Sequence, residues 1–168
     1  MRTRCPRRNP SPHDEFWGSE GAGVLPMARS TGRVLLGLRS GAVRESDTWG
    51  VFGGAFRGVS GEDDELVAAE AALREFHEET GWDHRSGRSE ITPLLVFERP
   101  EFRYHNFLLV LPRQFTPELN WEHDDAAWFD LDDLPSPLHF GLEELLQDRE
   151  SLRTIRTYAR PTGRPRRR

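Results

Sequence analysis

The apolar positions of this chain fall into short runs separated by polar turns. Five of these runs have the length and composition of β-strands: 24–28, 33–38, 91–97, 102–111 and 127–129. The turn Ser30-Thr31-Gly32 separates the first two runs and predicts a hairpin, and Arg99-Pro100-Glu101 separates the third from the fourth. The intervening stretches 40–48 and 112–125 are predicted to be polar loops, and the second of them is acidic.

Two segments have the pattern of helices. Residues 65–80 are rich in Ala, Leu and Glu and contain no Pro or Gly, and Gly81 marks the expected end of the helix. Residues 141–158 predict a second helix, whose expected buried face consists of Leu142, Leu145, Leu146, Leu152 and Ile155. Strands interrupted by two helices predict a mixed α/β fold.

The charges are distributed unevenly around a net of −5. Residues 1–8 contain four Arg and residues 160–168 contain five, whereas 9–159 combine 14 Arg with all 28 Asp and Glu, a net of −14. We therefore expect an irregular basic lead-in over 1–20, one domain over 21–159 and a basic tail over 160–168. An acidic body repels a phosphate backbone, so long nucleic acid is not an expected partner. The basic ends either solubilise the chain or contact polyanions.

The length of 168 residues suits one domain with its own core. No apolar run approaches the roughly 18 residues that cross a bilayer, and no apolar stretch follows the basic N-terminus. Neither a membrane span nor a secretory signal is expected. Cys5 is the only cysteine, which excludes an internal disulfide. A cytoplasmic location is therefore expected.

The helix predicted over 65–80 carries the candidate chemistry. Glu75, Glu78 and Glu79 are spaced i, i+3 and i+4, so they share one face. The expected apolar stripe lies roughly 140° away, and it consists of Leu66, Ala69, Leu73 and Phe76. Arg74 precedes Glu78 by four residues and is expected to orient it through an ion pair. Three like charges on one face either bind a hard divalent cation, such as Mg²⁺, or form a plain solvated surface.

The residues around this helix resemble the Nudix box, written Gly-x5-Glu-x7-Arg-Glu-U-x-Glu-Glu-x-Gly-U with U apolar. The second half of the motif matches at seven specified positions: Arg74, Glu75, Phe76, Glu78, Glu79, Gly81 and Trp82. The first half departs from it, because Gly54 precedes Arg74 by 20 positions where the family has 14. An insertion within 55–66 accounts for the difference, and Gly61-Glu62 then replaces the usual Gly-Glu pair. The resemblance covers residues 20–158.

This resemblance implies a Nudix-type α/β/α sandwich around a mixed β-sheet, with the box as a loop-helix-loop. It implies metal binding by Glu75, Glu78, Glu79 and the Gly53 carbonyl, with Arg74 in the catalytic machinery. The expected cofactor is Mg²⁺ or Mn²⁺, which neutralises a diphosphate and activates a water molecule. In the acidic loop, Glu122 is the preferred extra metal ligand or general base. Asp124, Asp125 and a simple solvated loop are the alternatives.

Four further residues are candidates for substrate binding: Arg39, Gly54, Trp49 and His105. Loop ion pairs, core packing or a structural hydrogen bond would explain Arg39, Trp49 and His105 equally simply. The expected function is metal-dependent cleavage of a diphosphate bond in a nucleoside diphosphate linked to another moiety, such as a nucleoside triphosphate, a nucleotide sugar or ADP-ribose. A catalytically silent nucleotide-sensing Nudix module is the alternative, and an isopentenyl diphosphate isomerase ranks last. A small nucleotide-type substrate and no membrane are expected, and a homodimer is compatible with either reading.

Overall fold

The computed structural model describes residues 20–57, 64–83 and 88–159. The basic lead-in and the basic tail lie outside these ranges, as do residues 58–63, the middle half of the segment 55–66 in which the insertion was predicted. Along the chain the strands are β1 (Glu20–Ala28), β2 (Val34–Arg39), β3 (Trp49–Gly50), β4 (Phe52–Phe56), β5 (Glu90–Arg99), β6 (Phe102–Leu111) and β7 (His123–Phe129). The helices are α1 (Asp64–Thr80), α2 (Phe140–Gln147) and α3 (Arg149–Ala159).

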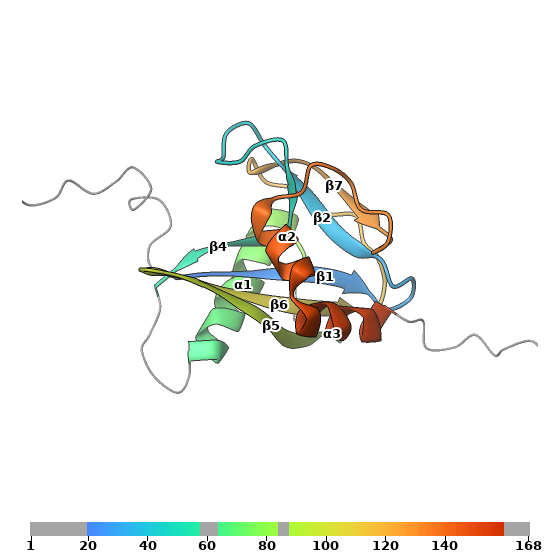
Figure 1. Ribbon diagram of the computed structural model, residues 1–168. Helices are drawn as coiled ribbons and strands as arrows, with labels where there is room; N and C mark the ends of the chain where they lie inside the picture. The colour runs from blue at the N-terminus through green and yellow to red at the C-terminus, as the bar shows by residue number, and fades with distance from the viewer. Residues whose placement is uncertain (1–19, 58–63, 84–87, 160–168) are drawn as a thin grey trace, which may run out of the picture.

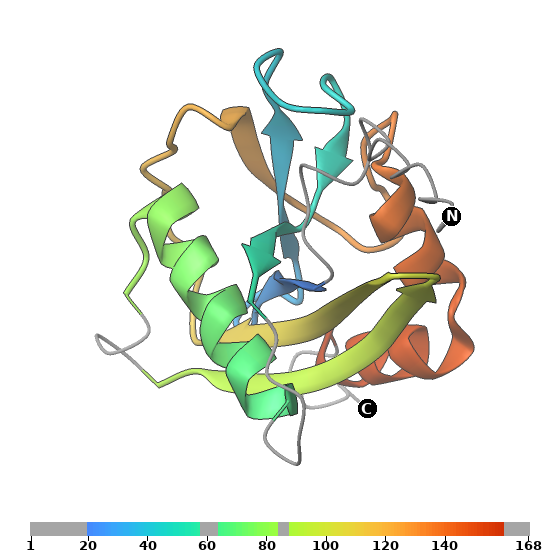
Figure 2. The ribbon, with the colours of Figure 1, turned by 90° about the vertical axis from the view of Figure 1, so that its left-hand side faces the viewer.

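A mixed seven-stranded sheet forms the centre of the fold. Its main path runs β3-β2-β1-β6-β5, while β4 also pairs with β1 and β7 with β2. The pairing of β1 with β6 is parallel and all the other pairings are antiparallel. Helix α1 covers one face and the pair α2 and α3 covers the other (Figures 1 and 2). The predicted α/β/α arrangement is confirmed.

Each face of the sheet has its own hydrophobic core. On the α1 side, side chains of β1, β4 and β6 pack against three small helix residues, Ala68, Ala71 and Ala72, and against Phe76. On the other side, alternate residues of β1 and β6 pack against Leu142, Leu145 and Ile155 of α2 and α3. Successive residues of β6 therefore face opposite cores, as the two-residue period of a strand requires. None of the helices in the described ranges is long and apolar enough to cross a membrane.

The predicted helix over 141–158 is wrong in one respect, because it is two helices. Asp148 between them has extended backbone angles, φ −70° and ψ 116°. Its Oδ2 accepts a hydrogen bond from the Ser151 backbone N–H at 2.8 Å, which begins α3. This local capping interaction outweighs the uninterrupted apolar pattern and turns the chain between α2 and α3.

The apolar stripe predicted for α1 is also partly wrong. Leu66 is 66% exposed, whereas Ala68 and Ala72 are fully buried. Small residues allow the helix to approach the glycine-rich β1 and β4 closely, so the packed face is rotated from the one that the larger side chains suggested. This rotation places Glu79 on the buried side of the helix rather than opposite it.

Two strands begin four residues before their predicted starts. Strand β1 begins at Glu20 rather than at Val24, and β7 begins at His123, inside the stretch predicted as an acidic loop. After Gly53-Gly54 the chain continues as part of strand β4, which pairs with β1. A Cβ atom on Gly53 would lie 2.3 Å from the Ala22 carbonyl oxygen, so only glycine allows β4 to approach β1 this closely.

Candidate active site

The last two turns of α1 place the three motif glutamates in different environments. Glu79 is only 3% exposed, Glu75 is half-buried and Glu78 is exposed. Arg74 contacts the two more accessible carboxylates: its Nη2 lies 3.1 Å from Glu75 Oε1, and its Nε lies 3.8 Å from Glu78 Oε1. The ion pair predicted between Arg74 and Glu78 is therefore present, and the same guanidinium also holds Glu75.

The charge of the buried Glu79 carboxylate is only partly balanced by the groups around it. Burial raises its pKa well above the ordinary value, and the nearby charges of Glu122 and Glu75 raise it further. The Gly53 backbone amide and Arg39 oppose this shift without cancelling it. Among the described residues, none forms a hydrogen bond with Glu79 Oε2. A buried carboxylate in this condition is costly unless a proton or a cation neutralises it.

The β4 backbone forms the wall beside these carboxylates. A Cβ atom on Gly54 would lie 2.6 Å from Glu75 Oε2, so a side chain at this position would displace the carboxylate. Burial raises the pKa of Glu75 against the hydrogen bond from Arg74, and the charges of Glu78 and Glu122 add to the increase. Glu75 is thus confined between a backbone wall and an arginine.

The loop before β7 brings Glu122 to the end of α1. The backbone N–H of Asn120 donates to the Glu79 carbonyl at 3.3 Å, and that of Glu118 donates to the Thr80 carbonyl at 2.9 Å. Asn120 in turn fixes Glu122, because its Oδ1 accepts the Glu122 backbone N–H at 2.9 Å and its Nδ2 donates to Glu122 Oε1 at 3.3 Å. The loop residue favoured from the sequence is therefore electrostatically coupled to Glu75 and Glu79, whereas Asp124 and Asp125 are exposed.

Arg39 lies between this carboxylate cluster and a cavity on the α2 side of the sheet. Its Nε and Nη2 donate to the Arg44 carbonyl at 3.0 and 2.8 Å, which fixes the guanidinium against the 40–48 loop. Its charge lowers the pKa of Glu79 and of two histidines, His123 and His139. The predicted substrate residue Arg39 is therefore adjacent to the cluster.

The cavity has a volume of about 870 Å³ and begins at Gly53. Its lining combines aromatic side chains with cationic and polar ones, among them Arg39, Arg99, Phe97, Tyr104, Phe140, Asn106 and His139. A pocket of this size with a few polar groups is typical of a small-molecule site. The Gly53 backbone N–H also donates a hydrogen bond to the Glu79 carboxylate. A ligand in the cavity would therefore extend toward the carboxylates.

His139 closes one side of the cavity. Its Nδ1 accepts the Gly141 backbone N–H at 3.1 Å at the start of α2, and its Nε2 lies 3.2 Å from Glu45 Oε2. Burial and the charge of Arg39 lower its pKa to about 4 despite the neighbouring carboxylate. The ring is therefore neutral at pH 7, with the Nε2 hydrogen donated to Glu45.

Two of the predicted substrate residues lie away from this site. Trp49 packs edge-on against Phe129 at 5.1 Å between ring centroids, and its backbone exchanges hydrogen bonds with Pro137 and His139. It therefore supports the start of α2 rather than facing the cavity. His105 lies on the α1 side of β6, the face opposite the cavity, where its Nε2 is 3.3 Å from Glu20 Oε2.

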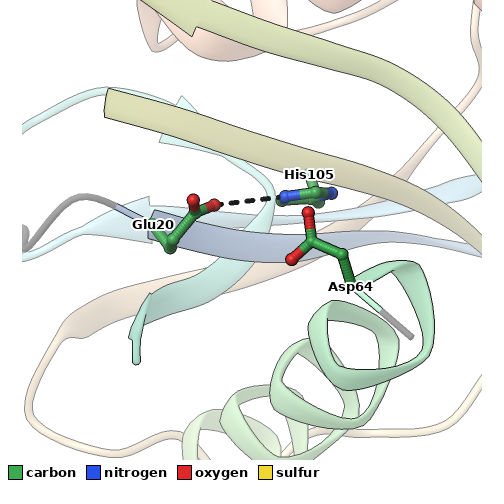
Figure 3. Close-up of side chains that lie close together, drawn as sticks. All are labelled: Glu20, Asp64 and His105. Carbon is green, nitrogen blue, oxygen red and sulfur yellow. Dashed lines mark hydrogen bonds and ion pairs between the residues drawn. The ribbon is translucent and has the colours of Figure 1, made fainter. Parts of the chain in front are cut away.

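His105 belongs to a second cluster, at the N-terminal end of α1. Ligand-type atoms of Glu20, Asp64 and His105 all lie within 4.8 Å of one another (Figure 3). In the described part of the chain this is a tighter group than the motif glutamates form. However, Arg103 Nη2 lies 3.1 Å from Glu20 and 2.5 Å from Asp64. A guanidinium already supplies the positive charge there, so the group fits a cation poorly.

Five cavity residues are not among the predicted substrate residues: Phe97, Phe102, Tyr104, Asn106 and Phe140. The structure places all five on the cavity. The two-residue period of β6 offered a usable signal, because residues 102, 104 and 106 share one face while 103 and 105 share the other. Phe140 had no comparable signal, since its place depends on the turn that precedes α2.

Comparison with known proteins agrees with this architecture. A family model described as the NUDIX domain matches residues 19–149. No curated protein matches the chain significantly. Among solved structures, the Nudix hydrolase RenU from M. Smegmatis is 21% identical with a TM-score of 0.66, covering 89% of this chain and 92% of that one. A MutT NUDIX hydrolase from Burkholderia pseudomallei is 24% identical with a TM-score of 0.56, covering 76% and 95%.

A third similar structure is the NUDIX domain of Shewanella oneidensis NrtR complexed with ADP ribose, 19% identical with a TM-score of 0.57, covering 87% of this chain and 93% of that one. At these identities the structures establish the shared fold alone. The family model, by contrast, spans well over half of the sequence and includes the helix with Glu75, Glu78 and Glu79. The chain belongs to the Nudix family.

Proposed function

We propose that this protein is a metal-dependent hydrolase that cleaves a diphosphate bond in a nucleoside diphosphate linked to another moiety. The observation that carries the proposal is the environment of Glu79. Its carboxylate is buried, has an oxygen without a partner among the described residues, and lies beside Glu75 and Glu122. Such a cluster gains more from a cation than an exposed acidic surface does.

The residues present fit a hard divalent cation. Glu75, Glu78, Glu79 and the Gly53 carbonyl offer oxygen ligands. Oxygen ligands suit Mg²⁺ or Mn²⁺ better than metals that favour thiolate or imidazole. The bound metal would neutralise the diphosphate and lower the pKa of a water molecule.

The side chains of this protein would then orient and deprotonate that water. Arg74 holds Glu75 and Glu78 in position through its two ion pairs. Glu122, fixed by Asn120, is our proposed general base and takes the proton of the attacking water. A new P–O bond forms as the bridging P–O bond breaks, and the electron pair leaves with the bridging oxygen. The products are a nucleoside monophosphate and a phosphorylated remainder.

The adjacent cavity supports a nucleotide-type substrate. Its aromatic side chains suit a planar base, and Arg39 and Arg99 suit phosphate charge. Two proteins whose solved structures have the same fold are named for substrates that contain phosphoanhydride bonds. They are an E. coli dihydroneopterin triphosphate pyrophosphohydrolase and a C. elegans Ap4A hydrolase. They indicate the range of substrates that this fold accepts.

A nucleotide panel supplied with Mg²⁺ or Mn²⁺ tests the proposal, with products separated chromatographically. Hydrolysis in ¹⁸O-labelled water should place the label on a phosphate product, because attack occurs at phosphorus. Turnover in excess chelator, or cleavage of simple monophosphate esters alone, would contradict the proposal.

A catalytically silent nucleotide-sensing module is the second candidate. The observation in its favour is the resemblance to the NrtR NUDIX domain, which was solved with ADP ribose. The two functions separate in one measurement, since a sensing module would bind nucleotides in the presence of metal without releasing products. The retained Glu75, Glu78 and Glu79 favour the hydrolase.

A further inference from the structure

A β-bulge in β5 contacts Asn106, a residue that lines the cavity. The register of β5 against β6 shifts between Pro93 and Val96, so Leu95 does not pair in the regular ladder. Both backbone groups of Leu95 are instead taken by side chains. Its N–H donates to Ser151 Oγ on α3 at 2.9 Å, and its carbonyl accepts from Asn106 Nδ2 on β6 at 2.9 Å. Bulges commonly redirect a side chain next to an active site.

The hydrogen bond to Leu95 fixes the orientation of the Asn106 amide. A carbonyl oxygen only accepts hydrogen bonds, so the amide nitrogen must face Leu95 and the Oδ1 atom must face away from it. Asn106 is 5% exposed and lines the cavity. Its acceptor atom, Oδ1, thus points away from the bulge, on a residue that lines the cavity.

An aromatic wall stands beside this acceptor. The rings of Phe97 and Phe140 lie edge to face with centroids 6.1 Å apart, and the Arg99 guanidinium lies 5.0 Å from the Phe97 ring centroid. Phe140 lines the cavity and is 43% exposed, so part of its ring is open to a ligand. This arrangement suits a flat aromatic ligand that packs against Phe97 and Phe140 and directs one edge toward Asn106.

We propose that Asn106 is the residue that determines base specificity, by accepting a hydrogen bond from the exocyclic amino group of a nucleobase held against Phe97 and Phe140. The inference rests on the proposed function. The exocyclic amine projects furthest from the base ring, so it is the donor that reaches a recessed acceptor while the ring stays at the wall. The substrate class is thus a nucleotide with an amino-bearing base: adenine, guanine or cytosine.

Asn106 would distinguish bases with an exocyclic amino group from bases without one. A base that lacks the amine would bury Asn106 Oδ1 away from water and offer it no hydrogen-bond donor. Leaving one buried polar group unpaired changes affinity by about 10- to 100-fold. Wild-type protein should prefer ATP, GTP or CTP by that factor over the same nucleotide with its amino group replaced by hydrogen. The ratio of kcat/KM within each such pair is the quantity to measure.

Two variants distinguish recognition of the base by Asn106 from stabilisation of the β-bulge at Leu95. Asn106→Leu removes the acceptor and should reduce the within-pair ratio to about one for the preferred base. Ser151→Ala removes the partner of Leu95 N–H at the other end of the same bulge, without touching the cavity, and should keep the ratio. A ratio that persists in Asn106→Leu, or that is lost equally in Ser151→Ala, overturns the proposal.

Binding of non-hydrolysable methylene analogues of the same pairs, measured by calorimetry, separates this inference from the hydrolase proposal. Amino-dependent binding that disappears in Asn106→Leu supports the role of Asn106 even if no nucleotide is turned over, in which case only the hydrolase proposal fails. Turnover without amino preference in wild-type protein overturns the role of Asn106 alone. Absence of both binding and turnover overturns both.

Discussion

Gly54 and Glu75 are so close that a single methyl group on the glycine would fall 2.6 Å from the carboxylate oxygen. Gly54→Ala should therefore push Glu75 out of place and lower kcat by about 10- to 100-fold, the usual effect of misplacing a catalytic group by about 1 Å. Gly41→Ala is the matched control, because a Cβ atom there meets nothing within 4 Å. Equal activity of the two variants would show that the position of Glu75 is unimportant.

Removing the charge of Glu79 should have opposite effects on activity and on stability. Glu79→Gln should lower kcat about a hundredfold or more, since a ligand carboxylate contributes several kcal/mol and each ~1.4 kcal/mol is tenfold. The melting temperature in chelator should rise, because a buried charge with raised pKa is gone. Glu78→Gln should also lower kcat but leave that melting temperature almost unchanged, because Glu78 is exposed. Near-normal turnover in both folded variants would remove the basis of the hydrolase proposal.

Metal dependence should follow the oxygen-rich ligand set. We expect no hydrolysis after chelation, recovery with Mg²⁺ or Mn²⁺, and poor recovery with Zn²⁺, which favours thiolate and imidazole ligands. Initial rates across a metal series provide the measurement. Recovery of hydrolysis with Zn²⁺ alone would contradict this metal site and would indicate a site that contains histidine, such as the Glu20, Asp64 and His105 cluster.

His139 should make the fold sensitive to mild acid. Its pKa is about 4 in the folded protein against an ordinary 6.5, so below about pH 6.5 the unfolded chain takes up a proton that the folded protein does not. Stability is then full above pH 6.5 and is lost as the pH falls toward 4, by up to about 3 kcal/mol. His139→Asn keeps an N-cap acceptor for Gly141 and removes this titration. Urea unfolding at about pH 7.5 and pH 5 should show a smaller loss for the variant, and equal losses would refute the assignment.

The two faces of α1 should differ in their effect on folding. Phe76 is fully buried between Phe52 and Trp82, so Phe76→Ala should cost about 3–5 kcal/mol of unfolding free energy. Leu66 is exposed, and Leu66→Ala should change stability by less than about 0.5 kcal/mol. Chemical denaturation of both variants checks the rotated packing face directly.

The sequence predicted the elements whose signals are local. Strand β6 was predicted with its observed boundaries, and α1 was predicted to within one residue because Gly81 ends it clearly. The break at Asp148 was missed because one capping hydrogen bond outweighs a continuous apolar pattern there. The buried face of α1 was misplaced because the depth of helix packing depends on glycines in β1 and β4, which are remote in sequence.

The site was predictable to a similar extent. Glu75, Glu78 and Glu79 share a motif, and Glu122 stood out in an acidic loop, so the carboxylates could be named from the sequence. The cavity could not, because its wall combines the β5–β6 hairpin with the start of α2, which long-range packing brings together. His105 was named as a substrate residue, but its side chain lies on the face of β6 opposite the cavity, whereas Asn106 lines the cavity. The bulge that contacts Asn106 has no local sequence signature.

The carboxylate cluster and the cavity come from different segments of the chain, and Gly53 and Arg39 belong to both. Helix α1 and the loop at Asn120 hold the acids, whereas the tip of the β5–β6 hairpin and the start of α2 form the cavity wall. Substitutions in the hairpin and α2 can therefore alter which molecule is admitted while leaving the reaction centre intact. Such a division marks Phe97, Asn106 and Phe140 as the positions to randomise if the proposed activity is to be directed to other substrates.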